Sequence, residues 1–385
     1  MRKINLHLAL LFAHFNIIHA PLTQATHTEL RGLSQEEHCG ACLETLAKDE
    51  VLKLQCNHLF HETCIQQWLK REHSCPLCRT DLSPKSEGVD TNTHISADTS
   101  IQESPRDLRG TNLQSMNLRD GHFNRVNFSK ANLIKANLSR ANLADTTFIE
   151  TRLMWSLLID TDMTGADLTG ADLTGANLTR ADLTRADFTH ANLTRANLAA
   201  AHLTGGNLRH AQLKHAHMIN TTLREVNLSN SNLESACLRG ADLRGADLSN
   251  TRLVYADLSQ ADLRGANLSE ACLTGAKLTG ADLTEAQLTK ATLFKAHLND
   301  AKLREANLNH ANVKGADLTR ANLYEANLRY ADFRHANLCE ANLGGAHLMR
   351  TCLISAHLKG TIGVPFRQFI QSIQTRTYLK KSPQG

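Results

Sequence analysis

A large apolar residue recurs at every fifth position from Leu108 to Leu358, without one insertion, over about fifty-one consecutive units. On an α-helix five residues rotate by about 500°, so successive leucines would drift around the helix and never form an apolar stripe. A single flat strand fails too, because an odd period sends alternate leucines to opposite faces. A chain that turns a corner in every unit keeps each leucine pointed at one common axis. The period therefore predicts a β-solenoid.

The units share a second feature, a small residue two positions before the central leucine, as in Ala131-Asn132-Leu133 and Ala336-Asn337-Leu338. Aromatic residues make up only 4% of the chain although 42% is hydrophobic, so leucine and alanine must supply most of the core. The repeat resembles the pentapeptide-repeat family, whose A(D/N)LXX units cover about two-thirds of this sequence. The resemblance implies a mainly β fold, a right-handed quadrilateral β-helix with twenty residues per coil. About twelve to thirteen coils would extend roughly 60 Å at the usual strand spacing.

The remaining sequence divides into segments of different composition. Residues 1–20 form an apolar leader behind Arg2 and Lys3, and two interpretations stand: a signal peptide, or a helix that packs or lies on a membrane surface. Its apolar run is too short for a transmembrane helix. Residues 83–105 are rich in Ser, Thr, Asp and Asn, which predicts a flexible linker before the solenoid at residues 106–360.

After the last repeat, residues 361–385 are expected to form a capping helix and a tail. Pro365 stands near a plausible helix start, and apolar residues follow at helical spacing: Phe366, Phe369, Ile370 and Ile373. A solenoid needs its ends covered to prevent stacking with other chains. The alternative use of this helix is a homodimer interface.

Six of the ten cysteines lie close together between residues 39 and 78, interleaved with histidines. The candidate ligands, in order, are Cys39, Cys42, Cys56, His58, His61, Cys64, Cys75 and Cys78, with two, thirteen, one, two, two, ten and two residues between them. Zinc prefers four thiolate or imidazole ligands in a tetrahedron, and a Cys-x-x-Cys turn supplies two of them. Eight ligands therefore predict two Zn²⁺ ions. Clustered cysteines of this kind also indicate a reducing compartment rather than a disulfide framework.

Residues 36–82 resemble the RING-H2 zinc fingers, down to Cys75-Pro76-Leu77-Cys78-Arg79. The resemblance implies a cross-brace in which Cys39, Cys42, His61 and Cys64 hold the first zinc, and Cys56, His58, Cys75 and Cys78 the second. It also implies an E3 ubiquitin ligase that binds a ubiquitin-charged conjugating enzyme and positions the thioester for attack, without a covalent intermediate on this chain.

Five residues match the surface that such modules offer to the conjugating enzyme and ubiquitin: Ala41, Leu43, Trp68, Pro76 and Arg79. Arg79 matches the cation that contacts both partners. Active relatives usually carry Ile or Val where this chain has Ala41, and losing that contact should weaken binding by about 1 to 3 kcal/mol. Leu43 compensates for part of this loss.

If the zinc module brings the ubiquitin machinery, the solenoid is the natural site for a protein substrate. With twenty residues per coil, about seven of some fourteen outward apolar residues fall on one face: Ile134, Met154, Trp155, Val254, Tyr255, Phe294 and Ile354. This enrichment predicts a partner-binding surface. At four consecutive small positions alanine is replaced by hydroxyl residues, for which we expect a structural role inside the solenoid: Thr146, Thr151, Ser156 and Thr161.

Three functional hypotheses follow, of which a RING-type E3 ligase with a substrate-binding solenoid is the first. A non-enzymatic scaffold stabilised by zinc is the second, and Ala41 favours it. A DNA-mimicking solenoid is the third, but the formal net charge of +4, with both signs interspersed, is not acidic enough for that role and predicts no nucleic-acid binding. The expected location is cytoplasmic, and the combination of domains also suggests a secreted effector acting in a eukaryotic host cytosol.

Overall fold

The computed structural model describes residues 23–24, 51–53, 59–61 and 107–363. The chain divides into two units, residues 1–102 and 103–385. The predicted leader, the linker, residues Phe366 to Ile373 of the capping helix and most of the zinc module lie outside the described residues. In the described parts, no helix has the length and apolar character needed to cross a membrane.

Three short strands form the described part of the first unit: β1 (Thr23–Gln24), β2 (Val51–Lys53) and β3 (Leu59–His61). They form one antiparallel sheet in the order β1-β2-β3. In the β2–β3 pair, Val51 lies opposite His61 and Lys53 lies opposite Leu59. Residues 54–58, which connect these two strands, carry the candidate ligands Cys56 and His58.

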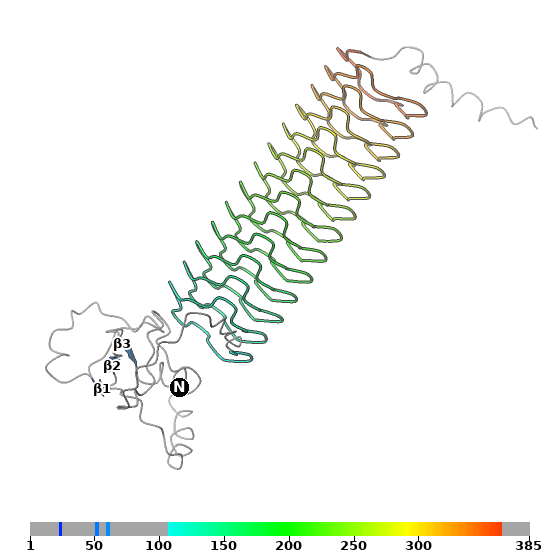
Figure 1. Ribbon diagram of the computed structural model, residues 1–385. Coiled ribbons are helices and arrows are strands. Elements are labelled where there is room, and N and C mark those ends of the chain that lie inside the picture. Colours follow the sequence, from blue (N-terminus) through cyan, green and yellow to red (C-terminus); the bar gives the residue numbers. More distant parts are fainter. Residues whose placement is uncertain (1–22, 25–50, 54–58, 62–106, 364–385) are drawn as a thin grey trace, which may run out of the picture. The chain divides into compact units, whose positions relative to one another are not determined.

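The second unit is a solenoid in which single-residue parallel bridges join positions twenty residues apart, from Asp107↔Asn127 to Asn342↔Ile362. Twenty residues contain four five-residue units, so each coil consists of four units. Successive coils stack along one axis, as the colour gradient in Figure 1 shows. The structure thus confirms the β-solenoid that the sequence period predicts.

The five positions of a unit have different roles, which Ala131-Asn132-Leu133-Ile134-Lys135 illustrates. The first, small residue donates its N–H to the central residue of the preceding unit and closes a β-turn. The second N–H bonds to the preceding coil, and the third and fifth N–H groups bond to the following coil. The fourth N–H bonds to the side-chain Oδ1 of Asn132 at 3.3 Å. All five backbone donors are therefore satisfied, which explains why Asn or Asp is so frequent at the second position.

Every unit turns through a left-handed residue at its fifth position. Thirty-eight non-glycine residues and thirteen glycines at this position have φ between +53° and +73°. This φ, together with the turn bond, indicates a type II turn, which normally favours glycine. Non-glycine residues at positive φ are otherwise uncommon and cost about 1 kcal/mol or more. From Gly110 to Glu340, the hydrogen bond of each of these residues to the following coil holds the conformation in place.

The core consists of the central and small positions, whose side chains are almost all fully buried. In the first coils phenylalanine replaces leucine, and the rings of Phe128 and Phe148, one coil apart, stack with centroids 5.3 Å apart and an interplanar angle of 6°. Phe123 packs edge-on against Phe128 at 5.6 Å. Identical positions in successive coils therefore lie directly above one another, which is the geometry that generates rows of side chains on the outside.

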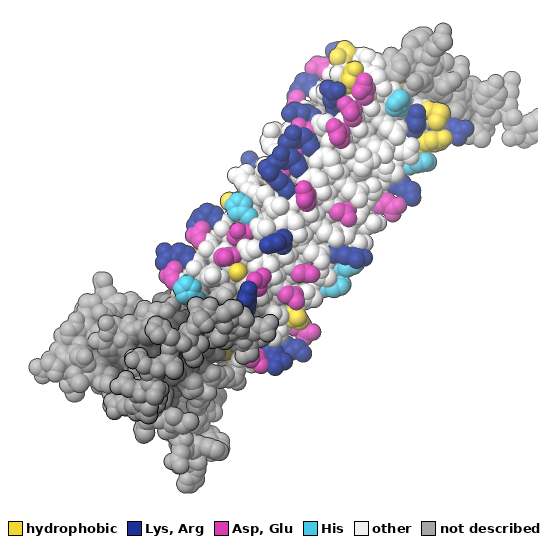
Figure 2. All heavy atoms as spheres, viewed as in Figure 1, with side chains coloured by type: hydrophobic (Ala, Val, Ile, Leu, Met, Phe, Trp, Pro, Cys, Tyr) yellow, Lys and Arg dark blue, Asp and Glu magenta, His cyan; other side chains and the backbone are white. Residues whose placement is uncertain are grey.

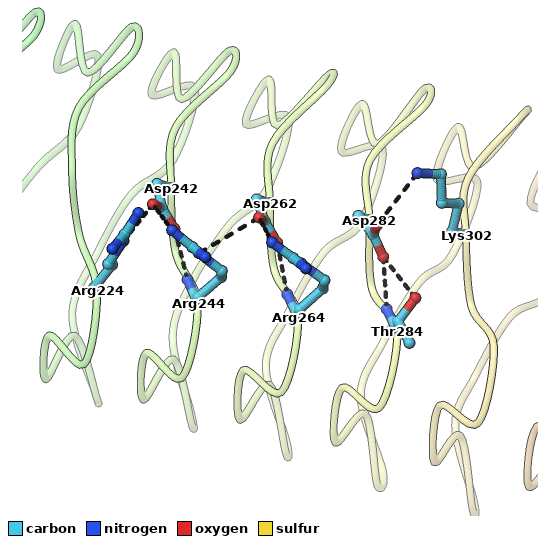
Figure 3. Close-up of polar contacts among 8 residues, drawn as sticks. All are labelled: Arg224, Asp242, Arg244, Asp262, Arg264, Asp282, Thr284 and Lys302. Carbon is cyan, nitrogen blue, oxygen red and sulfur yellow. Dashed lines mark hydrogen bonds and ion pairs between the residues drawn. The ribbon is translucent and has the colours of Figure 1, made fainter.

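Charged residues form such rows. Asp242, Asp262 and their neighbours along the axis alternate with arginines, as Figure 3 shows. Arg244 donates two hydrogen bonds of 2.8 Å to Asp242 and lies 3.5 Å from Asp262. Arg264 binds Asp262 in the same two-pronged way, and its hydrogen bonds lower the pKa of that carboxyl. These ion pairs tie neighbouring coils together.

Candidate functional site

The zinc module is described only in its strands. β3 ends at His61, a predicted ligand of the first zinc, and the β2–β3 register places the backbone of His61 opposite Val51. The other predicted ligands and the predicted contacts to the conjugating enzyme lie outside the described residues: Cys39, Cys42, Cys56, His58, Cys64, Cys75, Cys78, Ala41, Leu43, Trp68, Pro76 and Arg79. These assignments stay predictions.

The chemistry of the predicted donor set suits zinc. Six thiols and two imidazoles supply two tetrahedral sets of soft and borderline ligands, and no carboxylate is needed. Within residues 107–363 and the three strands, no group of three or more His, Cys, Asp or Glu side chains is arranged to hold a metal.

The predicted partner face has a definite place in the solenoid. All seven residues occupy the fourth or fifth position of a unit, and these units are stacked in register along the solenoid. The residue numbers show this: the fourth-position residues differ by multiples of twenty, and each fifth-position residue directly follows one of them. We call this surface the Trp155 face: residues 112, 114 and 115 and every twentieth residue after each of them. Ile134 and Met154 lie in adjacent coils beside Trp155, whereas Tyr255 lies five coils further along.

Only two of the seven side chains are truly exposed. Trp155 exposes 53% and Tyr255 64% of its surface, while the other five are half-buried between neighbouring turns: Ile134, Met154, Val254, Phe294 and Ile354. Thr174, Thr194, Lys214 and Glu234 separate the two aromatic residues along the row. The face is therefore a row with two aromatic positions rather than one continuous apolar patch.

A glycine in the following coil accommodates each exposed aromatic ring. A Cβ atom on Gly175 would lie 2.4 Å from ring carbons of Trp155, and a Cβ on Gly275 would lie 2.5 Å from Tyr255. Both rings thus lie against the bare backbone of the next turn. The same pairing at two places, one hundred residues apart, fixes both aromatic side chains on the surface without burying them. Sequence reasoning found the aromatic residues but missed these glycines, although their spacing of twenty was visible.

Two acidic residues of the Trp155 face are held by neighbouring cations. Glu234 accepts a hydrogen bond from Arg252 at 2.9 Å, which lowers the pKa of its carboxyl, and Lys214 lies 3.5 Å away. Partial burial acts to raise the pKa of Asp332, but hydrogen bonds from Arg334 outweigh it and the net shift is downward. Both carboxylates are therefore ionised and paired at neutral pH.

The hydroxyl residues of the small positions act inside the solenoid. Thr146 and Thr151 each donate a 2.8 Å hydrogen bond to a backbone carbonyl of the preceding coil, and Thr161 bonds to Leu158 within its own coil. Ser156 Oγ is buried and has no partner among the described residues. The structural role predicted for this coil is confirmed for the three threonines, and no ligand needs to be invoked.

Together these features define a protein with a β-solenoid of five-residue units and a separate Cys/His-rich module. The family described as "Pentapeptide repeats" matches in eight stretches between residues 107 and 362. This chain therefore belongs to the pentapeptide-repeat family. Residues 37–79 match the family described as "Ring finger domain", which implies zinc binding and confirms the resemblance noted in the sequence.

Curated relatives match only a short part of this chain. RING-H2 finger protein ATL33 of Arabidopsis thaliana is 31% identical over 102 residues, which cover 24% of this chain and 43% of that protein. E3 ubiquitin-protein ligase RNF181 of Rattus norvegicus is 43% identical over 56 residues, covering 14% and 34%. The chain spans less than half the length of these relatives.

Solved structures resemble the repeat. HetL, a pentapeptide repeat protein involved in heterocyst differentiation regulation from the cyanobacterium Nostoc, is 36% identical and covers 55% of this chain and 90% of its own, with a TM-score of 0.21. A pentapeptide repeat protein of the Arabidopsis thaliana thylakoid lumen is also 36% identical, covering 28% and 69%, with a TM-score of 0.14. Because both TM-scores are low, the family assignment rests on the repeat match.

Proposed function

We propose that this chain is a RING-type E3 ubiquitin-protein ligase whose solenoid binds the protein to be modified. The observation that carries the proposal is the match of residues 37–79 to the RING finger family, together with relatives over this segment that are E3 ligases. The proposed partners are a ubiquitin-conjugating enzyme, ubiquitin and a protein substrate. Cysteine usage supports action in a reducing compartment such as a cytosol.

In this proposal the module holds two zinc ions in a cross-brace, with Cys39, Cys42, His61 and Cys64 on one and Cys56, His58, Cys75 and Cys78 on the other. Zinc, when bound, supplies covalent cross-links that let a segment too short for its own core fold. Arg79 and Trp68 then contact the charged conjugating enzyme and restrict the ubiquitin thioester to a reactive pose. For the solenoid we infer a right-handed, four-sided coil, supported by the four units between bridge partners.

The experiment that tests the proposal is ubiquitin transfer by the full-length chain with a panel of conjugating enzymes. We expect autoubiquitination with at least one of them, with a marked loss in Arg79→Ala and complete loss in Cys39→Ala. Zinc content separates the two variants, because Arg79→Ala should keep its metal and Cys39→Ala should not. Activity that survives Cys39→Ala would refute the role of the RING segment.

A non-enzymatic scaffold is the second candidate, and Ala41 is the observation that favours it, since a smaller side chain offers the conjugating enzyme less apolar contact. Restoring the bulk with Ala41→Ile distinguishes the two. An enzyme with weakened affinity should gain activity several-fold from this change, whereas a scaffold should stay inactive with every conjugating enzyme.

A further inference from the structure

The charges of the solenoid are balanced overall but not around its circumference. Residues 107–363 carry twenty-eight Lys and Arg and twenty-five Asp and Glu. The twenty-residue register assigns each of them to one of four rows of units. The Trp155 face has only three acidic residues, Asp172, Glu234 and Asp332, against eight basic ones: Lys135, Arg152, Arg195, Lys214, Arg252, Lys295, Lys314 and Arg334.

The opposite sign prevails half a coil away. The row that contains residues 122, 124 and 125, and every twentieth residue after each, carries ten acidic and seven basic residues. Figure 2 shows one side of the solenoid, where Lys and Arg side chains are most frequent along the margins and Asp and Glu also lie across the middle. The solenoid therefore presents a basic row on one side of its circumference and an acidic row on the other, which a composition count does not reveal.

Three of the eight cations on the Trp155 face form ion pairs with its carboxylates. Glu234 holds Lys214 and Arg252, and Asp332 holds Arg334. The other five cations form no ion pair with any residue in the described part of the chain: Lys135, Arg152, Arg195, Lys295 and Lys314. Lys295 lies 5.3 Å from the ring centroid of Phe294. By contrast, Arg140 and Arg180 in another row are each bonded to an aspartate of the preceding coil.

The unpaired cations share their face with the two exposed aromatic rings. Arg195 lies two coils beyond Trp155, and Tyr255 lies five coils beyond it. Five coils correspond to about 24 Å at roughly 4.8 Å per coil, and an extended chain covers that distance in about seven residues at 3.3 Å each. Because the side chains of an extended chain alternate between its two sides, an even spacing of about six or eight residues places two apolar side chains on the side that faces both rings, with acidic residues between them to meet the cations.

We propose that the Trp155 face binds an extended, acidic segment of a partner protein that carries two apolar residues about six or eight positions apart. This deepens the proposed function, on which it rests, by naming the chemistry of the substrate segment. The unpaired cations attract and orient the acidic residues, and the rings of Trp155 and Tyr255, already held against glycine, supply the apolar contacts at little cost in side-chain ordering. Binding of the segment should therefore depend on the positive charge of this face as much as on its two aromatic residues.

A display library of random sixteen-residue peptides, selected on the full-length zinc-loaded protein, tests the proposal. We expect the selected peptides to be acidic and to carry two apolar residues about six or eight positions apart. Charge reversal in Arg195→Glu with Lys314→Glu should weaken their binding by about tenfold or more, and rising salt should weaken it too. The matched control reverses two exposed cations of another row, Arg239→Glu with Lys277→Glu, and should leave binding unchanged.

The aromatic positions have their own variants. Trp155→Ser with Tyr255→Ser should abolish binding of the selected peptides, while Tyr324→Ser with Tyr330→Ser, on other rows, should not. Peptides that need Trp155 and Tyr255 but are basic or neutral would overturn the acidic partner and leave substrate binding by the face intact. The absence of any peptide that depends on this face would overturn both.

Two other anionic ligands serve as competing probes. One is a twenty-base-pair DNA duplex, and the other is a vesicle containing phosphatidylserine. If either probe binds the face more tightly than the selected peptides, and loses this binding in Arg195→Glu with Lys314→Glu, the face would be assigned to nucleic acid or membrane instead. Autoubiquitination of the same variants is measured in parallel. If it is absent while acidic peptides still bind, the ligase proposal fails and the docking proposal stands.

Discussion

The contact between Trp155 and Gly175 gives a prediction whose size follows from the structure. Gly175→Ala places a methyl group 2.4 Å from the indole ring, so the ring must leave the backbone of the next turn. Gly170→Ala, in the preceding unit, is the matched control: its φ of +65° is nearly the same as the +67° of Gly175, but the nearest atom to its new methyl group is 3.6 Å away. Both substitutions carry the cost of alanine in a left-handed turn, about 1 kcal/mol.

The difference between the two substitutions isolates the aromatic contact. A fully buried tryptophan removes about 150–250 Å² from water, and Trp155 is 53% exposed. About 100 Å² is therefore at stake, which sets an upper bound of about 2.5 kcal/mol at 25 cal/mol per Å². Because the displaced ring keeps part of this contact, we expect Gly175→Ala to reduce the free energy of unfolding by about 1 to 2 kcal/mol more than Gly170→Ala.

The assay is urea denaturation combined with tryptophan emission in a Trp68→Phe background, which leaves Trp155 as the one tryptophan of the chain. Gly175→Ala should shift the emission to the red, and Gly170→Ala should not. In a Trp155→Ala background the two glycine substitutions should cost the same. Equal costs with Trp155 present, or an unchanged emission maximum, would refute the packing of the ring on Gly175 and with it the geometry of the Trp155 face.

Three further predictions concern the solenoid. Leu248→Ala should cost about 3 to 5 kcal/mol by calorimetry, because this side chain is fully buried and the stacked coils restrict collapse; a cost under 1 kcal/mol would contradict a rigid core. Asp187→Ala should cost about 1 to 2 kcal/mol, since its carboxylate accepts the backbone N–H of Thr189 at 2.8 Å, while Asp187→Asn, which keeps the acceptor, should be nearly neutral. Arg264 lowers the pKa of Asp262, so the ion pair stabilises the fold fully above the unfolded pKa of about 3.9, and this stabilisation is lost as the pH falls through the folded pKa. The difference in unfolding free energy between wild type and Asp262→Asn should therefore shrink from pH 6 to pH 2. A difference that stays constant over this range would contradict the ion pair.

The period of five was enough to predict the solenoid, because the central residue can face one axis only if the chain turns in every unit. The turn itself was harder to foresee. Glycine stands at only thirteen of its left-handed positions, so the usual sequence signal for a positive φ is absent at most units. What holds residues such as Ala200 there is the hydrogen bond to the next coil, which is a property of the stack rather than of the local sequence.

The candidate surface was predictable in position but not in character. Counting by twenty placed Trp155 and Tyr255 on one face, but it did not show that Ile134 and Phe294 would be half-buried between turns. The same counting by twenty, applied to Lys and Arg, would also have predicted the uneven charge. Which cations are neutralised, however, depends on side-chain contacts across coils, such as that between Glu234 and Arg252, which sequence spacing alone does not determine.

The discharge of ubiquitin from a charged conjugating enzyme to free lysine, in a single turnover with the zinc-loaded full-length chain, tests the central claim most directly. The account predicts that the chain accelerates discharge from at least one conjugating enzyme of a panel, and that Arg79→Ala removes most of the acceleration while the zinc content stays the same. No acceleration with any conjugating enzyme, from wild type or from Ala41→Ile, would contradict it.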